Sequence, residues 1–176
     1  SVAVCENGNY YNRFYFVHPD GAVQHYDKKH LFTFGGEHKR FTAGTERVVV
    51  NFRGVRILLE VCYDLRFPVW SRNLGDYDMI LYVASWPTPR VDAWSALLRA
   101  RAIENQCYVA GVNRMGTDPT CEYSGGSAII DPYGKTIAEC PWSRESAVSA
   151  DIDMEALQAF RKKFPVLDDA DPFTLI

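Results

Sequence analysis

Apolar and polar residues alternate in two stretches of the first sixty positions, which is the pattern of strands with one buried face. Each stretch contains a turn-forming pair, Asp20-Gly21 in the first and Arg53-Gly54 in the second. A pair of alternating segments around such a turn predicts a β-hairpin. The four strands are expected over NRFYFVHP (12–19), AVQHYDK (22–28), RVVVNF (47–52) and VRILLEV (55–61).

Two later segments, DMILYVA (78–84) and CYVAGVN (107–113), are apolar along nearly their whole length. Such runs are typical of strands buried on both faces. Between them, DAWSALLRARAIEN (92–105) predicts a helix with Asp92 as its N-cap. Its apolar stripe consists of Trp94, Leu97, Leu98 and Ala102.

The remaining segments add shorter elements around this centre. VWSRNL (69–74) is helical in character, and MEALQAFRKKF (154–164) predicts a late helix. Further strands are expected within 124–140, around the turn Asp131–Gly134, and over ESAVSADID (145–153). No repeat or linker interrupts the chain, so we expect one α/β domain over 1–176 in which helices cover packed sheets.

Composition excludes several classes of function. The 176 residues are 47% hydrophobic and 14% aromatic, which is ample for a core, and a net charge of −3 favours no polyanionic partner such as nucleic acid. No run of about 18 apolar residues predicts a membrane span, and the first residues lack the order of a signal peptide, so a cytoplasmic location is expected. The four histidines show no metal-ligand spacing, and no metal is expected. Five cysteines without a C-x-x-C pair indicate reduced thiols.

Cys62 lies where a buried strand runs into a polar turn, in the segment VCYDLRFP (61–68). Backbone N–H groups and a helix start at such a place are expected to lower the thiol pKa. On position alone, packing as a small hydrophobe is the commoner role. The charged residues Asp64 and Arg66 favour chemistry, because a merely structural turn would not need them at a buried strand end. A second polar cluster spans 26–41 and holds Lys28, Lys29 and Glu37, although a solvated basic surface would look the same.

Three ordered motifs, YDKKHLF (26–32), VCYDLRFP (61–68) and SWP (85–87), together resemble the carbon–nitrogen hydrolase (nitrilase) superfamily. The runs VCYDLRFPVWSRN and RAIENQCYVAGVNR are most similar to its omega-amidase branch. The resemblance implies a nitrilase-like four-layer α-β-β-α sandwich. It also implies that the N-terminal portion is missing here, because the family's general-base glutamate precedes the region where this chain begins.

The resemblance assigns roles to five residues. It makes Cys62 the nucleophile and Lys28 the catalytic lysine, with Lys29 a bystander. Glu37 matches a second glutamate beside the lysine and the thiol. The Lys28 ammonium and the N–H of Tyr63 would stabilise the oxyanion. Trp86 either walls the pocket or is a core aromatic at a strand end, and both interpretations stay open.

Other polar and sulfur-bearing residues are expected to be structural. Arg66 is interpreted as a partner of Asp64 or of nearby backbone, and Cys107 as packing. Arg99 and Arg101 are expected on a solvated helix face. No role is assigned to the three remaining cysteines, which are Cys5, Cys121 and Cys140.

The implied function is a thiol amidohydrolase that needs no cofactor. It would hydrolyse the terminal amide of 2-oxo dicarboxylic acid monoamides such as 2-oxoglutaramate to an acid and ammonia. An amidase for deaminated glutathione is the alternative within the same chemistry. A non-catalytic family member acting as an interaction module is a second alternative, and a redox-sensing thiol would need a resolving cysteine near Cys62. The resemblance further implies a homodimer, with the tail DDADPFTLI (168–176) suited to reaching across its interface.

Overall fold

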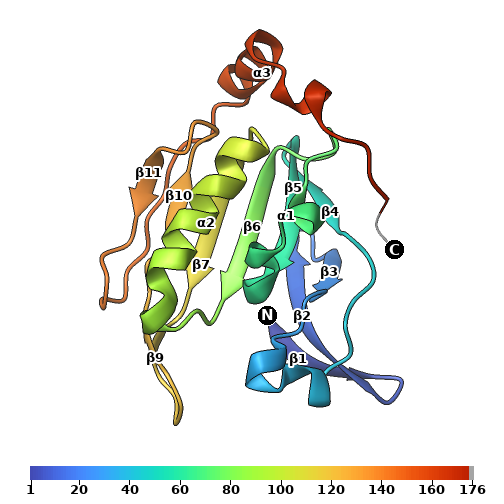
Figure 1. Ribbon diagram of the computed structural model, residues 1–176, viewed down its shortest axis with the longest axis vertical. Helices are drawn as coiled ribbons and strands as arrows, with labels where there is room; N and C mark the ends of the chain where they lie inside the picture. Colours follow the sequence, from blue (N-terminus) through green and yellow to red (C-terminus); the bar gives the residue numbers. More distant parts are fainter. Residues whose placement is uncertain (175–176) are drawn as a thin grey trace.

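The computed structural model describes residues 1–174, which form a mixed α/β fold around a six-stranded sheet (Figure 1). The strand order is β11-β10-β7-β6-β5-β4. The central pairs β5–β6 and β6–β7 are parallel, and the outer pairs are antiparallel. The strands are β4 (Val49–Phe52), β5 (Val55–Val61), β6 (Met79–Ala84), β7 (Tyr108–Asn113), β10 (Ala128–Ile130) and β11 (Thr136–Glu139).

Successive side chains of β5 point to opposite faces of this sheet and enter two separate cores. Ile57 and Leu59 pack on one face, and Leu58 packs on the other. Because both faces are covered, the strand is apolar along most of its length, as the sequence predicts. The helix α2 (Val91–Glu104) covers the Leu58 face with Trp94, Leu98 and Ala102, which confirms most of its predicted apolar stripe.

A separate three-stranded sheet covers the other face of β5. It consists of β1 (Val2–Glu6), β2 (Asn9–Val17) and β3 (Val23–Asp27), in that order, with all pairs antiparallel. Phe14 and Tyr26 belong to the same core as Ile57 and Leu59. The described residues therefore form three layers: helices, the six-stranded sheet and the three-stranded sheet. The hairpin of β2 and β3 matches the sequence pattern, whereas β1 was not predicted.

Several sequence-based boundaries are wrong. The helix α2 begins at Val91, so Asp92 lies in its first turn instead of capping it. The helix α1 is only one turn long, over Pro68–Ser71, since Arg72 leaves the helical conformation. No strand forms over residues 145–153, which pass as an extended loop into the helix α3 (Met154–Lys163). The other elements are β8 (Met115–Thr117), β9 (Glu122–Ser124) and the 3₁₀ helices η1 (Thr33–Gly35), η2 (Glu37–Lys39), η3 (Cys62–Arg66), η4 (Thr88–Arg90) and η5 (Val166–Asp169).

Arg101 is buried, which contradicts its predicted place on a solvated helix face, while Arg99 is exposed as expected. The Arg101 guanidinium donates to the Leu65 carbonyl at 2.6 Å and forms an ion pair with Glu104 at 2.7 Å. It crosses from α2 to the turn that follows β5. The helix and that turn are therefore joined by a buried, charge-assisted hydrogen bond.

The parallel strands β5, β6 and β7 end at the same edge of the sheet. They deliver Cys62, Ser85 and Asn113 there, one from each strand end. Residues just past the carboxyl ends of parallel strands commonly build binding sites. In the described part of the chain, no helix is both long and apolar enough to cross a membrane. The tail that the sequence assigns to an interface, 168–176, includes residues 175 and 176, which lie outside the described residues.

Candidate active site

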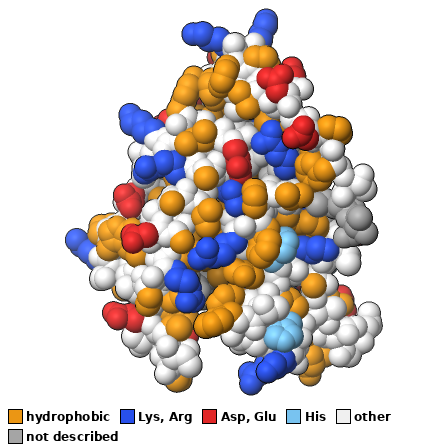
Figure 2. Space-filling view, viewed as in Figure 1, with side chains coloured by type: hydrophobic (Ala, Val, Ile, Leu, Met, Phe, Trp, Pro, Cys, Tyr) orange, Lys and Arg blue, Asp and Glu red, His pale blue; other side chains and the backbone are white. Residues whose placement is uncertain are grey.

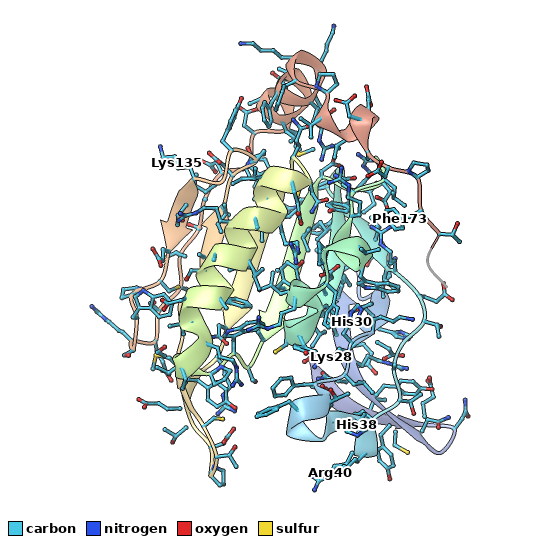
Figure 3. The ribbon with its side chains drawn as sticks, in the orientation of Figure 1. Lys28, His30, His38, Arg40, Lys135 and Phe173 are labelled. Carbon is cyan, nitrogen blue, oxygen red and sulfur yellow. The ribbon has the colours of Figure 1, made fainter. Side chains whose placement is uncertain are left out.

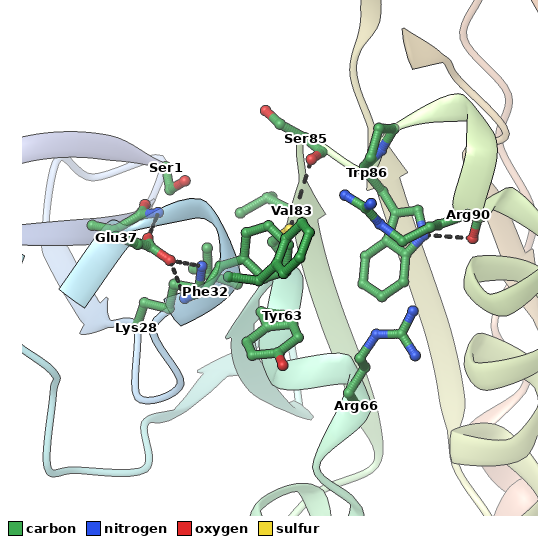
Figure 4. Close-up of a pocket in the computed structure, with 15 residues that line it drawn as sticks. Ser1, Lys28, Phe32, Glu37, Tyr63, Arg66, Val83, Ser85, Trp86 and Arg90 are labelled. Carbon is green, nitrogen blue, oxygen red and sulfur yellow. Dashed lines mark hydrogen bonds and ion pairs between the residues drawn. The ribbon is translucent and has the colours of Figure 1, made fainter. Parts of the chain in front are cut away.

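Cys62 follows β5 directly and opens the 3₁₀ helix η3. Its backbone has φ of +50°, a left-handed conformation that non-glycine residues adopt only when their surroundings enforce it. The sharp turn presents the sulfur to a cavity of about 580 Å³ (Figure 4). The Cys62 Sγ lies 3.8 Å from the Ser85 carbonyl oxygen at the end of β6.

Burial raises the pKa of the Cys62 thiol, and the Lys28 ammonium opposes that rise without overcoming it. The expectation of a lowered pKa is therefore wrong. The physical reason is that burial removes the solvent that would stabilise a thiolate, and the Lys28 charge and the Ser85 backbone do not compensate for that loss. A sulfur in such a place would need a general base to remove its proton before it could attack a substrate.

Lys28 follows β3 and is buried with 3% of its side chain exposed. Its Nζ lies 2.6 Å from the Glu37 Oε2, and both residues line the same cavity as Cys62. Glu37 Oε2 also accepts from the Phe32 backbone N–H at 2.6 Å, and Oε1 accepts from the Asn12 amide at 3.1 Å. Sequence reasoning missed Asn12, because an amide on an exposed-looking strand carries no motif.

The carboxylate of Glu37 keeps its charge in this enclosed place. Desolvation alone would raise its pKa, but the Lys28 ammonium and the hydrogen bonds from Phe32 and Asn12 bring the pKa below its ordinary value. The Lys28 Nζ and the Glu37 carboxylate form an ion pair at 2.6 Å. The cavity therefore holds a fixed cation that is available to stabilise a developing negative charge.

Arg66 does not pair with Asp64, so that interpretation is wrong. The Asp64 oxygens accept from Tyr26, His30 and the Val61 backbone instead. The Arg66 guanidinium lies over the Trp86 ring, 5.0 Å from its centroid, and lines the cavity. Arg66 is exposed, so its guanidinium charge remains accessible to a ligand.

Trp86 is both a core aromatic and part of the cavity wall, so the two interpretations left open by the sequence are compatible. It is 3% exposed, packs on Trp94 in the α2 core, and lines the cavity as well. Its indole N–H donates to the Arg90 carbonyl at 2.7 Å. The backbone of Trp86 is held by Asn113, whose Oδ1 accepts from its N–H at 2.7 Å and whose Nδ2 donates to its carbonyl at 2.9 Å. Sequence reasoning did not single out Asn113, although an amide closing an apolar strand was a visible signal.

The cavity has two chemically different sides (Figure 4). Lys28 and Glu37 lie on the side of the three-stranded sheet, and Arg66 and Arg90 lie on the side of Trp86. The aromatic residues Phe32 and Tyr63 lie between them, and Cys62 also lines the cavity. The surface that carries α2 shows basic side chains gathered beside an apolar strip in its lower half (Figure 2). The structure thus brings together Cys62, Lys28, Glu37, Tyr63 and Trp86, all five of the residues selected from the sequence.

Comparison with known proteins places the chain among amide-cleaving enzymes. Residues 1–162 match the family described as carbon–nitrogen hydrolase. The omega-amidase YafV of Escherichia coli (strain K12) is 53% identical over 176 residues, covering 99% of this chain and 69% of that protein. The 2-oxoglutaramate amidase of Bacillus subtilis (strain 168) is 41% identical over 172 residues, covering 96% of this chain and 66% of that protein.

Solved structures show the same similarity. XC1258 from Xanthomonas campestris, a CN-hydrolase superfamily protein with an arsenic adduct in the active site, is 46% identical to this chain. The two superimpose with a TM-score of 0.95 over 99% of this chain and 69% of that one. The similarity in sequence and in fold therefore extends along nearly the whole chain.

Proposed function

Because the chain belongs to the carbon–nitrogen hydrolase family, we propose that it is a thiol amidohydrolase of omega-amidase type. Its substrates are 2-oxo dicarboxylic acid monoamides such as 2-oxoglutaramate, whose terminal amide it converts to a carboxylate and ammonia. The observation that carries the proposal is the single cavity shared by Cys62 and the ion pair of Lys28 and Glu37. Identity of 53% to an omega-amidase and 41% to a 2-oxoglutaramate amidase supports the substrate class.

The reaction begins when a general base takes the Cys62 proton and the sulfur attacks the amide carbon. The resemblance assigns this base to a glutamate upstream of Ser1. The C=O bond opens to a tetrahedral oxyanion, which the Lys28 ammonium and the Tyr63 N–H stabilise. The C–N bond then breaks, the nitrogen takes the proton held by the base, and ammonia leaves a thioester on Cys62.

Water completes the cycle. The base takes a proton from water, the hydroxide attacks the thioester carbon, and the C–S bond breaks as the thiol is regenerated. The sum is amide plus water to carboxylic acid plus ammonia, with no oxidation or reduction. Glu37 contributes by orienting Lys28 through the 2.6 Å contact.

A substrate with a carboxylate at its far end suits the two arginines of the cavity. Within residues 1–174, neither Arg66 nor Arg90 has a carboxylate partner at salt-bridge distance. Arg90 lies over the Phe32 ring, 5.4 Å from its centroid, and Arg66 lies over Trp86. Guanidinium groups with free donors recognise carboxylates in bidentate geometry. We therefore propose that Arg66, which was expected to be structural, takes part in binding the substrate carboxylate.

The complete fold that we propose is the four-layer α-β-β-α sandwich, in which the three described layers are joined by an outer helical layer. One carbon–nitrogen hydrolase domain would then comprise 1–176 and the preceding segment. We further propose a cytoplasmic homodimer. Light scattering of the full-length protein at micromolar concentration would give twice the monomer mass, and a monomer mass would contradict the dimer.

The test of the function is ammonia release by the full-length protein from 2-oxoglutaramate, beside deaminated glutathione as the competing substrate. We expect faster release from 2-oxoglutaramate, none from the Cys62→Ser variant, and unchanged release from the Cys121→Ser control. Faster release from deaminated glutathione would replace the substrate assignment. No release from either compound would favour the interaction module.

A further inference from the structure

We propose that Asp64 is a positioning residue that fixes the segment bearing Lys28 against the segment bearing Cys62. The carboxylate is fully buried and accepts four hydrogen bonds. Oδ2 accepts from the Tyr26 hydroxyl at 2.8 Å and the Val61 N–H at 3.0 Å. Oδ1 accepts from the His30 N–H and pairs with the His30 Nδ1, both at 2.9 Å.

The donors flank both reacting side chains. Tyr26 precedes Lys28 by two residues and His30 follows it by two, while Val61 immediately precedes Cys62. The Tyr26 hydroxyl accepts in turn from the Lys29 N–H at 3.1 Å. The backbone on either side of Lys28 is therefore anchored to one carboxylate. That carboxylate belongs to Asp64, two residues after Cys62.

This connection matters because no strand pairing joins the two segments. Lys28 follows β3 of the three-stranded sheet, whereas Cys62 follows β5 of the six-stranded sheet. The two sheets meet through apolar side chains, and apolar packing has no strong directional preference. Four hydrogen bonds to a carboxylate are directional and charge-assisted, so they fix the distance between amine and sulfur more sharply than the packing does.

Aromatic contacts support the same junction. The His30 ring stacks on Phe67 with centroids 3.8 Å apart and planes 4° apart, and the Trp70 indole N–H donates to the Tyr26 hydroxyl at 3.1 Å. Lys28 is buried and the His30 side chain is partly exposed, and both lie beside the three-stranded sheet (Figure 3). Residues from both sheets thus converge on Asp64, which itself does not line the cavity.

A carboxylate at position 64 that acted only within its own turn would make a different set of hydrogen bonds. A carboxylate that only capped the turn after β5 would need the Val61 bond, which is local in sequence. The other three bonds come from Tyr26 and His30, at sequence separations of 38 and 34 residues. The geometry therefore favours a connection between segments over a simple cap.

The test uses Asp64→Asn in the full-length protein. The amide keeps the size of the side chain but replaces one acceptor oxygen by a donor, so it cannot serve both pairs of donors. Because the inference rests on the proposed function, one readout is amidase kinetics: we expect kcat to fall about 10²-fold, as small misplacements of reacting groups do, with KM nearly unchanged. Tyr26→Phe removes one of the four bonds to Asp64, together with the bonds that the hydroxyl accepts from Lys29 and Trp70, and should lower kcat less, which keeps the test usable if Asp64→Asn does not fold.

The second readout needs no substrate. In amide hydrogen exchange, we expect segments 28–32 and 61–67 to lose protection together in Asp64→Asn. The control is Asp78→Asn, since Asp78 is also buried and accepts four hydrogen bonds, from Arg56 and Arg161, away from the cavity. That variant should keep kcat and leave both segments protected. Loss of protection in 61–67 alone, or an unchanged kcat in folded Asp64→Asn, would overturn the connection, whereas absence of amidase activity in the wild type would overturn only the proposed function.

Discussion

The two ends of the central sheet contain the same kinds of buried polar residue, yet only one end is arranged for chemistry. At the amino ends of β6 and β7, Asp78 is surrounded by donors from Arg56 and Arg161, and the Asn73 amide donates to the carbonyls of Tyr77 and Asn105. These polar groups satisfy one another. Their hydrogen bonds hold the amino ends of the strands together.

At the carboxyl ends of the strands, hydrogen bonds hold some side chains in place, while other charged side chains have no ion-pair partner in residues 1–174. Asn113 fixes the backbone of Trp86 as Asn73 fixes its own neighbours. Beside it, however, lie a strained cysteine and two guanidinium groups without carboxylate partners in residues 1–174. A buried amide is therefore no sign of a site. A site is indicated instead by a rigid frame of hydrogen bonds around charged side chains that have no carboxylate partner in residues 1–174.

The sharpest contrast between the two ends is between their cysteines. Cys62→Ala should lower the amidase rate of the full-length protein by at least about 10⁴-fold, because the nucleophile is removed. Cys107 is fully buried directly before β7. Cys107→Ala should lower the stability of the protein but leave its turnover unchanged. Ammonia release at matched folded concentration measures both. If Cys62→Ala released ammonia nearly as fast as Cys107→Ala, the two ends of the sheet would not differ in their part in the reaction.

The next effect concerns two adjacent lysines. Lys28→Met should lower kcat about 10²- to 10³-fold through the loss of one oxyanion contact. Lys29→Met is the matched control, since its ammonium lies outside the cavity, 5.2 Å from the centroid of the Trp70 ring. Its kcat should stay close to that of the wild type. Steady-state kinetics of the two variants would refute the assignment if both lost activity equally.

A smaller effect separates the two amides. Asn113→Ser and Asn73→Ser should each destabilise the fold by about 1–3 kcal/mol, since each leaves buried backbone groups without partners. Only Asn113→Ser should also lower kcat/KM, by about tenfold, because the wall formed by Trp86 loosens. Denaturant unfolding and kinetics give the two numbers. Equal kinetics would show that the Trp86 wall needs no such frame.

The smallest effect is the response to acid, which the two ends should share. Desolvation opposes ionisation of Asp78, but hydrogen bonds and charge from Arg56 and Arg161 hold its pKa below the ordinary value, and the pKa of Glu37 is lowered likewise. A depressed folded pKa stabilises the protein above the unfolded pKa, about 3.9 for Asp and 4.3 for Glu. That stability is lost as pH falls through the folded pKa.

Unfolding free energies at pH 6 and pH 3 check this response. The stability advantage of the wild type over Asp78→Asn and over Glu37→Gln should shrink at the lower pH. Glu122→Gln, at an exposed carboxylate on β9 with no ion pair among the described residues, is a control for general acid effects. An advantage that grew toward pH 3 in either variant would contradict the direction of its pKa shift.

The sequence predicted most of the strands because periodicity and turn residues are local signals. The five residues that it selected are all among those that line the cavity, since the motifs that carry them lie in order along the chain. It missed the left-handed backbone and raised pKa of Cys62, the burial of Arg101 and the stacking of Arg66. Each of these depends on groups from distant segments, such as the Leu65 carbonyl that attracts Arg101 into the interior. Strand β1 and the false strand over 145–153 show that alternation alone does not determine pairing.

The contact from Arg101 to the Leu65 carbonyl has a practical consequence for engineering. One side of α2 supports the nucleophile turn, while Arg99 and Ile103 on the same helix are exposed. A fluorophore attached at position 99 would therefore lie on the outer surface of a helix whose inner surface is hydrogen-bonded to the turn that bears Cys62. Such a label would give an optical signal of active-site rearrangement without occupying the cavity.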